Sequence, residues 1–511
     1  MKNVIIALAT ALLLHPVCIF SQATTERTAE EFVSSYDAYI KKTLERLPDI
    51  PGVAVVVIKD DKPIFVRAYG MSDREAGVKA DADTMFYIAS STKSFTAMAA
   101  ALLDREGKIK LGDPIGKYST GIVFKNPVPA DKITIRDLLT HTSGLRNEVL
   151  VFRMAFTGQS DPADMRRVFG DETTFVDARY GKYNYDNMGY NIYGVLLQNH
   201  LGVKWQDLLQ EKVFNPLGLK HTTAYISKAP ARKWKVAAPY IFDPVAGKTM
   251  RAPLAKTDSN MQSAGGMFAS ASDIGRWLNM NMNDGKLNGK QVIPADIVRA
   301  AHTGYTPVTR SNEPFVGEGQ YGLGWQIGKY RNETVIYHHG GFPGYASHIS
   351  YLPEKKIAIA VLVNGDIAAA KSGHILATYG YDWWLQTPDL QQSYDKQLED
   401  TVANYAKWRQ GAQASAAERA KRTSQLTRPV ADYAGTYRND TYGTIEITAV
   451  GNDLSVKMGN MNAVATPFTQ TETIRVELIP GQGEVIKFVP NADGKFASIM
   501  YGRLSFEKVL R

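Results

Sequence analysis

Ser90 and Lys93 stand three residues apart in the sequence Phe86-Tyr-Ile-Ala-Ser-Ser-Thr-Lys. In a helix, residues with this spacing lie on one face, so the hydroxyl and the amine can come within hydrogen-bonding distance. An unprotonated lysine can take the proton of a serine hydroxyl and make the oxygen nucleophilic. The same Ser-x-x-Lys spacing also occurs at Ser393 and Ser505, so at least two of the three pairs must be accidental.

The surroundings of Ser90 distinguish it from the other two serines. It follows the apolar stretch 85–89 and precedes a run of helix formers at 95–103. The amides at a helix N-terminus disfavour a cation, which would help to keep Lys93 neutral. A helix-capping serine followed by a surface lysine would explain the same pattern without catalysis.

Tyr185 and Asn187 form a second candidate pair, on a loop just before a helix predicted from Gly189. A tyrosine beside an ammonium loses its proton more readily and can act as acid or base. The asparagine offers a donor and an acceptor to a substrate amide. Tyr-x-Asn also occurs at Tyr330 and Tyr437, so this pair is weak evidence by itself.

The third candidate is the sequence His338-His339-Gly340-Gly341 at the end of a predicted strand. Glycines there let a substrate backbone approach closely and leave amide donors open. Two packed or surface imidazoles are the alternative interpretation.

Other hydrolytic and nucleotide-binding signatures are missing. The sequence has no Gly-x-Ser-x-Gly, no His-Glu-x-x-His and no phosphate-binding glycine loop, and its nine histidines lack zinc-ligand spacing. We therefore predict neither a metal nor a cofactor.

Composition indicates a soluble globular protein. The 511 residues are 44% hydrophobic and 22% charged, and their number suggests two domains. The net charge of +8 includes no long basic run, so nucleic acid binding is not indicated.

The N-terminus predicts a signal peptide over residues 1–23. Lys2 supplies the positive end, 4–14 the apolar segment and 21–23 a small-x-small cleavage site. We therefore expect export to the periplasm or the extracellular space, with a buried N-terminal helix as the alternative. Cleavage would remove Cys18, the only cysteine, and no later apolar stretch is long enough to span a membrane.

Hydrophobic patterns predict an α+β fold, an α/β sandwich over residues 24–388. Its antiparallel sheet is built from both ends of this region and flanked by helices, with a helical region inserted between them. The expected strands are 53–58, 64–68, 335–339, 348–352 and 357–363.

A change of composition near residue 388 predicts two further parts. Residues 389–428 form a polar helical connector, and 429–511 form a small all-β domain. Alternation with polar residues predicts an inward-facing set in that domain: Ile445, Ile447, Leu454, Val456 and Met458.

The order Ser-x-x-Lys, then Tyr-x-Asn about 95 residues later, then His-x-Gly about 150 residues beyond, resembles the serine β-lactamase-like family. That family includes class C β-lactamases, penicillin-binding DD-peptidases, D-aminopeptidases and esterases. The resemblance covers roughly residues 30–385, and the tail resembles a lipocalin-like, barrel-like domain. Segments that fit the family are Leu138–Leu145, Ser263–Ser270, Tyr321–Trp325 and Gly341–Tyr345.

The resemblance implies roles for three catalytic residues. Ser90 would attack a carbonyl and form an acyl-enzyme, while Lys93 and Tyr185 would share the proton transfers. Which of the two is the base stays open, because a coupled pair can titrate as a unit.

The resemblance also implies five substrate-binding residues: Asn187, His338, His339, Gly340 and Gly341. Asn187 would orient a substrate amide, and the Gly341 amide would join that of Ser90 in an oxyanion hole. His338 stands where many relatives carry lysine, and His339 stands where they carry a small residue. Efficient β-lactam hydrolysis is therefore less expected.

These inferences predict an exported serine hydrolase that cleaves amide bonds, of D-amino-acid-containing or other small peptides. An esterase or weak β-lactamase is the alternative within the family. A non-catalytic penicillin-recognising or envelope-binding protein is the alternative of another class. The expected partner is a small-molecule or peptide substrate, and a homo-oligomer could form through the C-terminal domain.

Overall fold

The computed structural model describes residues 27–254, 256–308, 315 and 319–509; the predicted signal peptide lies outside the described residues. In this part of the chain, one antiparallel sheet has nine strands, and β1 lies between β2 and β18. The two ends of the region 24–388 therefore meet in one sheet, as predicted. In spatial order, the strands are β13 (Thr306–Val308), β14 (Gly319–Tyr321), β15 (Gln326–Tyr330), β16 (Glu333–Phe342), β17 (Tyr345–Leu352), β18 (Ile357–Val363), β1 (Gly52–Lys59), β2 (Lys62–Asp73) and β3 (Val78–Lys79).

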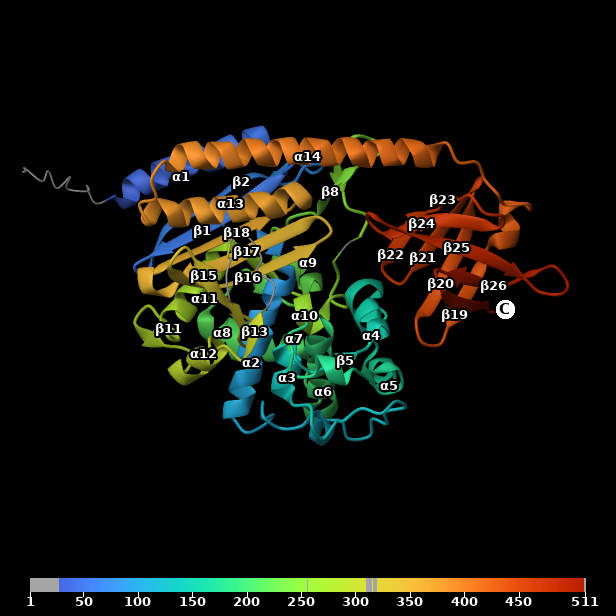
Figure 1. Cartoon of the computed structure of the whole chain (residues 1–511), viewed down its shortest axis with the longest axis horizontal. Helices are drawn as coiled ribbons and strands as arrows, with labels where there is room; N and C mark the ends of the chain where they lie inside the picture. Colours follow the sequence, from blue (N-terminus) through green and yellow to red (C-terminus); the bar gives the residue numbers. More distant parts are fainter. Residues whose placement is uncertain (1–26, 255, 309–314, 316–318, 510–511) are drawn as a thin grey trace, which may run out of the picture.

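Both faces of this sheet are buried, which explains why its strands are continuous apolar runs. Alternate side chains of a strand point to opposite faces, and in β1 the residues 53, 55 and 57 join one core while 54, 56 and 58 join the other. Figure 1 shows α1 (Ala29–Arg46), α13 (Ile367–Trp384) and α14 (Leu390–Ala420) along the first face. The second face packs on α11 (Ala271–Met282), against which α2 (Thr92–Arg105) lies through the stacked rings of Phe95 and Trp277. The predicted sandwich is confirmed.

The helical region between the two parts of the sheet is also present. Its helices are α3 (Ile135–Leu139), α4 (Glu148–Phe152), α5 (Pro162–Glu172), α6 (Met188–Leu201), α7 (Trp205–Leu209), α8 (Asn215–Leu217), α9 (Ala229–Arg232), α10 (Gln262–Gly265) and α12 (Ala295–Ala301). Its small sheets contain β4 (Met85–Tyr87), β5 (Leu145–Arg146), β6 (Thr174–Phe175), β7 (Thr222–Thr223), β8 (Tyr240–Asp243), β9 (Lys248–Arg251), β10 (Phe268–Ser270), β11 (Lys286–Leu287) and β12 (Lys290–Gln291).

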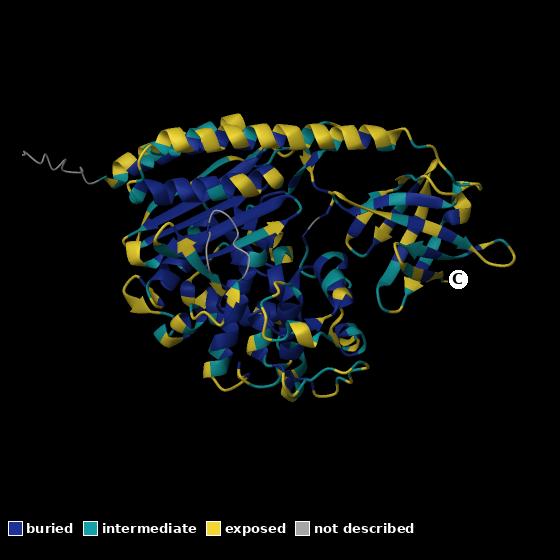
Figure 2. Cartoon of the chain, in the orientation of Figure 1, coloured by how far each residue is buried: buried dark blue, intermediate teal, exposed yellow. Residues whose placement is uncertain are grey.

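The long helix α14 crosses the first domain and leads toward a nearly closed C-terminal barrel (Figure 1). Much of its surface is exposed (Figure 2), as the polar sequence of this segment predicts. No described helix has the length and apolarity needed to cross a membrane. The barrel strands, in spatial order, are β22 (Met461–Val464), β21 (Asp453–Met458), β20 (Gly443–Val450), β19 (Gly435–Asn439), β27 (Leu504–Lys508), β26 (Phe496–Tyr501), β25 (Gln482–Pro490), β24 (Thr473–Ile479) and β23 (Thr466–Pro467).

The barrel interior is formed by the alternating apolar residues of these strands. The five residues that the sequence predicts to face inward are all buried. Aromatic rings fill more of the interior, because Tyr433 stacks on Phe496 and contacts Phe488 edge-on.

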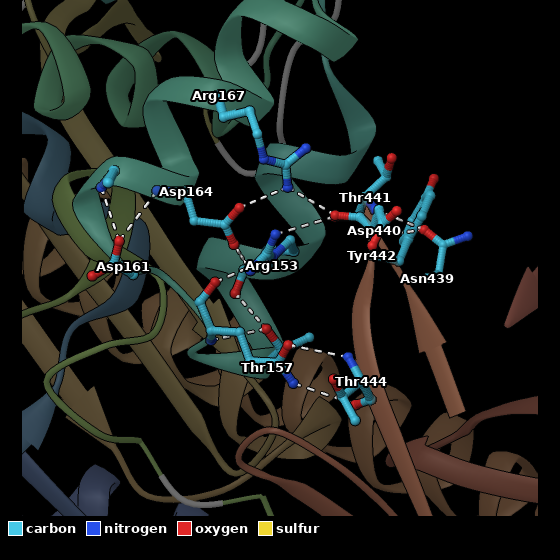
Figure 3. Close-up of polar contacts among 12 residues, drawn as sticks. Arg153, Thr157, Asp161, Asp164, Arg167, Asn439, Asp440, Thr441, Tyr442 and Thr444 are labelled. Carbon is cyan, nitrogen blue, oxygen red and sulfur yellow. Dashed lines mark hydrogen bonds and ion pairs between the residues drawn. The ribbon is translucent and has the colours of Figure 1, made fainter. Parts of the chain in front are cut away.

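The barrel is held against the helical region by a polar contact around Arg153 (Figure 3). This residue is only 4% exposed, and its side chain pairs with Asp164 and donates a hydrogen bond to the Thr441 carbonyl at 3.2 Å. Arg167 also pairs with Asp164 and donates to the Asp440 carbonyl at 2.8 Å. Two arginines on one side therefore bind the loop between β19 and β20 on the other.

We predict that Arg153→Ala lowers the free energy of unfolding by about 2 kcal/mol, because the Thr441 carbonyl loses this donor and the half-buried Asp164 loses one of its two arginine partners. Calorimetry should show the barrel melting at a lower temperature than in the wild type. The matched control is Arg438→Ala, which removes an exposed ion pair with Asp440 and should cost less than about 1 kcal/mol. Equal effects of the two substitutions would contradict this account of the interface.

Candidate active site

Ser90 lies on the 3-10 turn η1 (Ala89–Ser91), between β4 and α2. The turn is backbone-strained, because Ala89 has a φ of +46°, a conformation that residues other than glycine rarely adopt. Such strain persists only where the surroundings impose it. Here the Ile88 amide donates to the Met267 carbonyl at 3.1 Å, and Tyr87 pairs with Phe268 across β4 and β10.

Strand β16 fixes the turn from the other side. A Cβ atom on Gly340 would lie 2.0 Å from the Ile88 carbonyl oxygen, so only glycine permits this approach. Ser347 on β17 donates to the same carbonyl at 2.8 Å, and its hydroxyl lies 3.0 Å from that of Ser91. The sheet thereby sets the position of Ser90.

The amine of Lys93 is completely buried and contacts three oxygens. Nζ lies 2.8 Å from Asn187 Oδ1, 2.8 Å from the Ala264 carbonyl oxygen and 3.2 Å from Ser90 Oγ. The first two oxygens can only accept, so they take two N–H groups. A neutral amine would then direct its lone pair at the Ser90 hydroxyl, which is the geometry of a base beside a nucleophile.

Burial lowers the pKa of Lys93 to about 7, and the negative charge of Asp186 opposes this shift. A lysine in water has a pKa near 10.4 and is almost entirely protonated at neutral pH. In this site a large fraction of Lys93 is neutral at pH 7, which a proton acceptor requires.

Tyr185 stands at the rim of the same site, with 42% of its surface exposed. Desolvation raises its pKa, and a hydrogen bond with Ser90 opposes that shift. The Lys93 amine lies 4.9 Å from the centre of the tyrosine ring. Tyr185 therefore keeps its proton near neutral pH, and the expectation that the neighbouring ammonium makes it lose that proton more readily is not met, because desolvation outweighs the other effects.

His141 organises the loop that carries Tyr185, a role that we did not predict. Its Nδ1 accepts a hydrogen bond from the Asp186 amide at 3.3 Å, and its carbonyl accepts one from Asn184 at 2.9 Å. Its ring lies 4.6 Å from that of Tyr185, centre to centre. The segment Leu138–Leu145 contains this histidine, but no local pattern indicates that it contacts a residue 45 positions away.

His338 faces the same site and is uncharged. Its Nδ1–H donates to the His339 carbonyl at 2.7 Å, and its Nε2 accepts from the Tyr321 hydroxyl at 3.3 Å. Burial, reinforced by the charge of Lys93, lowers the pKa of His338 to about 3. The position at which the resemblance implies lysine therefore carries no positive charge near neutral pH.

A cavity of about 690 Å³ connects these groups and is lined by Ser90, Tyr185, His338, Gly340 and Gly341, among others. β15 pairs with β16 only as far as Tyr337, so no described strand occupies that side of β16 beyond it. An extended substrate backbone can pair with such a free edge. A Cβ on Gly341 would meet nothing within 4 Å, which leaves its backbone accessible from the cavity.

The His339 side chain does not join the group around Ser90. It pairs with His348 across β16 and β17, and the two rings lie 4.7 Å apart. The other Ser-x-x-Lys serines lie elsewhere, since Ser393 is on α14 and Ser505 on β27. The structure thus brings together Ser90, Lys93, Tyr185, Asn187, His338 and Gly340.

A second, more apolar groove lies on the other side of Tyr185. Its wall on the helical side includes Phe152, Phe156 and Met188, and the barrel contributes Tyr442, Tyr501 and Leu504. Tyr185 and Asn187 also line this groove. The barrel therefore forms part of the surroundings of the candidate site.

The chain belongs to the beta-lactamase family, whose family model matches residues 40–376. Among curated relatives, unguisins hydrolase ungD of Aspergillus violaceofuscus is 25% identical over 82% of this chain and 76% of its own length. Protein flp of Staphylococcus aureus is 25% identical over 66% of this chain and 64% of its own length.

Solved structures share the fold at lower identity. The octameric penicillin-binding protein homologue from Pyrococcus abyssi superposes with a TM-score of 0.61 at 22% identity, over 93% of this chain and all of that one. The penicillin-binding protein from Bacillus halodurans gives 0.54 at 21% identity, over 67% of this chain and 99% of its own.

We predict that Asp186→Asn lowers the pKa of Lys93 below about 7, because removing the nearby negative charge destabilises the ammonium. Asparagine keeps an oxygen to accept the Gly189 amide, as Asp186 does at 3.0 Å. Titration of 13C-labelled lysine side chains by NMR measures the change. Asp177→Asn, an exposed acid on the preceding segment, is the control and should leave the pKa of Lys93 unchanged. An unchanged or raised pKa in Asp186→Asn would show that another group controls Lys93.

Proposed function

We propose that the protein is an exported serine hydrolase that forms an acyl-enzyme on Ser90 and cleaves amide bonds of small peptides. The observation that carries this proposal is the buried Lys93 amine, with two N–H groups held by carbonyl oxygens and its third contact on Ser90 Oγ. A lysine that only stabilised the fold would not need to contact the Ser90 hydroxyl, which lines the cavity.

In the first step, neutral Lys93 takes the proton of Ser90 as Oγ attacks the substrate carbonyl carbon. The negative charge on the resulting oxyanion would be stabilised by the amides of Ser90 and Gly341. The intermediate then collapses, the carbon–nitrogen bond breaks, and the leaving amine takes a proton from Tyr185 or Lys93. Tyr185 is protonated near neutral pH and so has a proton to give, while Lys93 holds the proton that it took from Ser90.

In the second step, a water molecule attacks the acyl carbon while Lys93 or the Tyr185 phenolate accepts its proton. The ester bond to Ser90 breaks, the serine oxygen is reprotonated and the carboxylic acid product leaves. Asn187 would hold the substrate, because its Oδ1 is engaged by Lys93 and its amide N–H₂ remains to donate.

Two features support a peptide substrate. The edge of β16 that no described strand covers suits an extended backbone, and the neutral His338 offers no charge to a β-lactam carboxylate. The relative named unguisins hydrolase supports a hydrolytic activity without indicating the bond that is cleaved. We propose D-amino-acid-containing peptides as the leading class on the basis of the family resemblance, with esters as the alternative. Paired D- and L-aminoacyl amides, short esters and a chromogenic cephalosporin, assayed side by side, would rank these classes.

Export is proposed on the N-terminal pattern of Lys2, the apolar segment 4–14 and the small residues at 21–23. N-terminal sequencing of the protein recovered outside the cytoplasm should begin at Thr24.

We predict that a fluorophosphonate labels the wild type and not Ser90→Ala, because the reagent needs an activated serine. The chain supplies matched controls in Ser393→Ala and Ser505→Ala, which remove serines of the same Ser-x-x-Lys spacing. Both should be labelled like the wild type. Labelling of Ser90→Ala at the wild-type level would contradict Ser90 as the nucleophile. A folded wild type that is neither labelled nor acylated would favour a non-catalytic binding protein.

We predict that Lys93→Ala lowers kcat about 10²-fold or more, and that Lys396→Ala, at the equivalent place beside Ser393, leaves it unchanged. Since the base must be unprotonated, kcat/KM of the wild type should rise with pH to a plateau through a midpoint near the Lys93 pKa of about 7. Tyr185→Phe should lose a comparable factor in kcat. A rate that falls as pH rises through 7 would contradict Lys93 as the base.

We predict that Tyr501→Ala and Leu504→Ala raise KM several-fold for substrates with a large apolar group, with less effect on small ones, because each truncation removes part of the groove wall. Val464→Ala, at an exposed barrel position, is the control. Equal kinetics for all three variants and the wild type would show that substrates do not reach the groove.

A further inference from the structure

Three histidines from three elements converge on the sheet face opposite His338. His339 lies on β16, His348 on β17 and His374 on α13. Each offers a ring nitrogen, and these three nitrogen atoms all lie within 4.8 Å of one another. Residues 339 and 348 are directly opposite in the strand register, so the pairing of β16 with β17 places two of the three imidazoles side by side.

The hydrogen bonds of His348 direct a lone pair into the cluster. Its Nε2 lies 2.6 Å from the Ser350 hydroxyl, which in turn lies 2.7 Å from the Tyr381 hydroxyl. With Nε2–H donated to Ser350, the Nδ1 of His348 accepts a hydrogen bond from His374 Nδ1–H at 3.0 Å, and a metal ion bound by both nitrogens would take the place of that proton. Metal-binding histidines commonly have such a partner on the second ring nitrogen, which fixes the orientation of the imidazole.

The two ring nitrogens of His339 form no hydrogen bond with the described residues. Both nitrogens are buried. Unpaired buried polar atoms are costly and call for an explanation, such as an ion that they bind. The ring lies 4.3 Å from that of His374, centre to centre, in an edge-on arrangement.

The cluster also opens onto space that a further ligand could occupy. All three histidines line the cavity that contains Ser90, together with the small residues Ala370 and Gly373 of α13. Two nitrogens of a tetrahedral zinc centre lie about 3.3 Å apart when each is about 2.0–2.1 Å from the metal. The 3.0 Å between His348 and His374 is close to that separation.

We propose that His339, His348 and His374 bind a divalent transition metal of the zinc class, with a fourth coordination position open to the cavity. Three imidazoles without a thiolate or carboxylate suit Zn²⁺, Co²⁺, Ni²⁺ or Cu²⁺, not Mg²⁺ or Ca²⁺, which prefer oxygen ligands. The metal would connect β16, β17 and α13. Its fourth ligand would be water or an oxygen of a bound molecule.

The first experiment measures metal content and stability of the untagged full-length protein after chelator treatment and titration with Zn²⁺. The wild type should bind one Zn²⁺ per chain and unfold at a temperature a few degrees higher with the metal, because a ligand of the folded state stabilises it. His374→Gln and His339→Ala should each lose stoichiometric binding and this stabilisation. Failure of the wild type to bind one equivalent would overturn the proposal.

Matched variants separate this site from adventitious binding. His200→Ala removes an exposed histidine outside the cluster and should bind Zn²⁺ like the wild type. Ser90→Ala should also retain the metal, so the result does not depend on hydrolase activity. Ser350→Ala keeps all three ligands but loses the partner of His348, and its affinity should fall about 10-fold or more.

Co²⁺ gives a second readout that does not depend on the stability of any variant. The wild-type complex should show the visible d–d absorption of a low-coordinate nitrogen site, and Zn²⁺ should displace it in a one-to-one titration. Circular dichroism would show whether metal-free His374→Gln or His339→Ala is unfolded. If either is, the Co²⁺ absorption spectra of the wild type and of His200→Ala would decide whether the site exists. The spectrum of hexa-aqua Co²⁺ in the wild type, or equal binding by a folded His339→Ala, would refute the site.

Discussion

An amine taken out of water must replace its hydration with protein acceptors, and Lys93 does so with oxygens from three separate elements. Ser90 belongs to η1, Asn187 precedes α6, and the Ala264 carbonyl belongs to α10. Moving any of these elements would leave a buried polar group unpaired. The same burial lowers the pKa of Lys93, so the amine that joins these three elements is also prepared to accept a proton.

The position of Ser90 depends equally on a rigid sheet. Because both faces of the central strands are buried, β16 has little freedom to move, and Gly340 lets it approach the Ile88 carbonyl. The strained φ of Ala89 is then tolerated because hydrogen bonds fix the residue before it. The serine is thus held between a helix on one side and, on the other, an edge of β16 that no described strand covers.

Sequence patterns predicted the features that depend on local spacing. The strands, α2 and the Ser90–Lys93 pair follow from periodicity and from residues three apart, and the resemblance correctly indicated the family and the barrel. The contacts that local spacing could not predict join residues far apart in the chain, such as Lys93 with Ala264, Ser91 with Ser347 and His141 with Asp186. The His348–His374 contact is of the same kind, because strand register and helix packing create it, and no zinc-ligand spacing could indicate it.

The adjacent histidines of β16 show how one strand can serve two kinds of chemistry. Successive side chains of a strand point to opposite faces, so His338 faces Tyr321 and the Ser90 side of the cavity while His339 faces His348 and His374. Both ring nitrogens of His338 form hydrogen bonds with protein groups. Neither ring nitrogen of His339 has a hydrogen-bond partner among the described residues. His338 and His339 therefore have different surroundings, and we assign them different roles. A metal on His339 would pin β16 to β17 and α13, two residues from the Gly341 amide that we propose for the oxyanion hole.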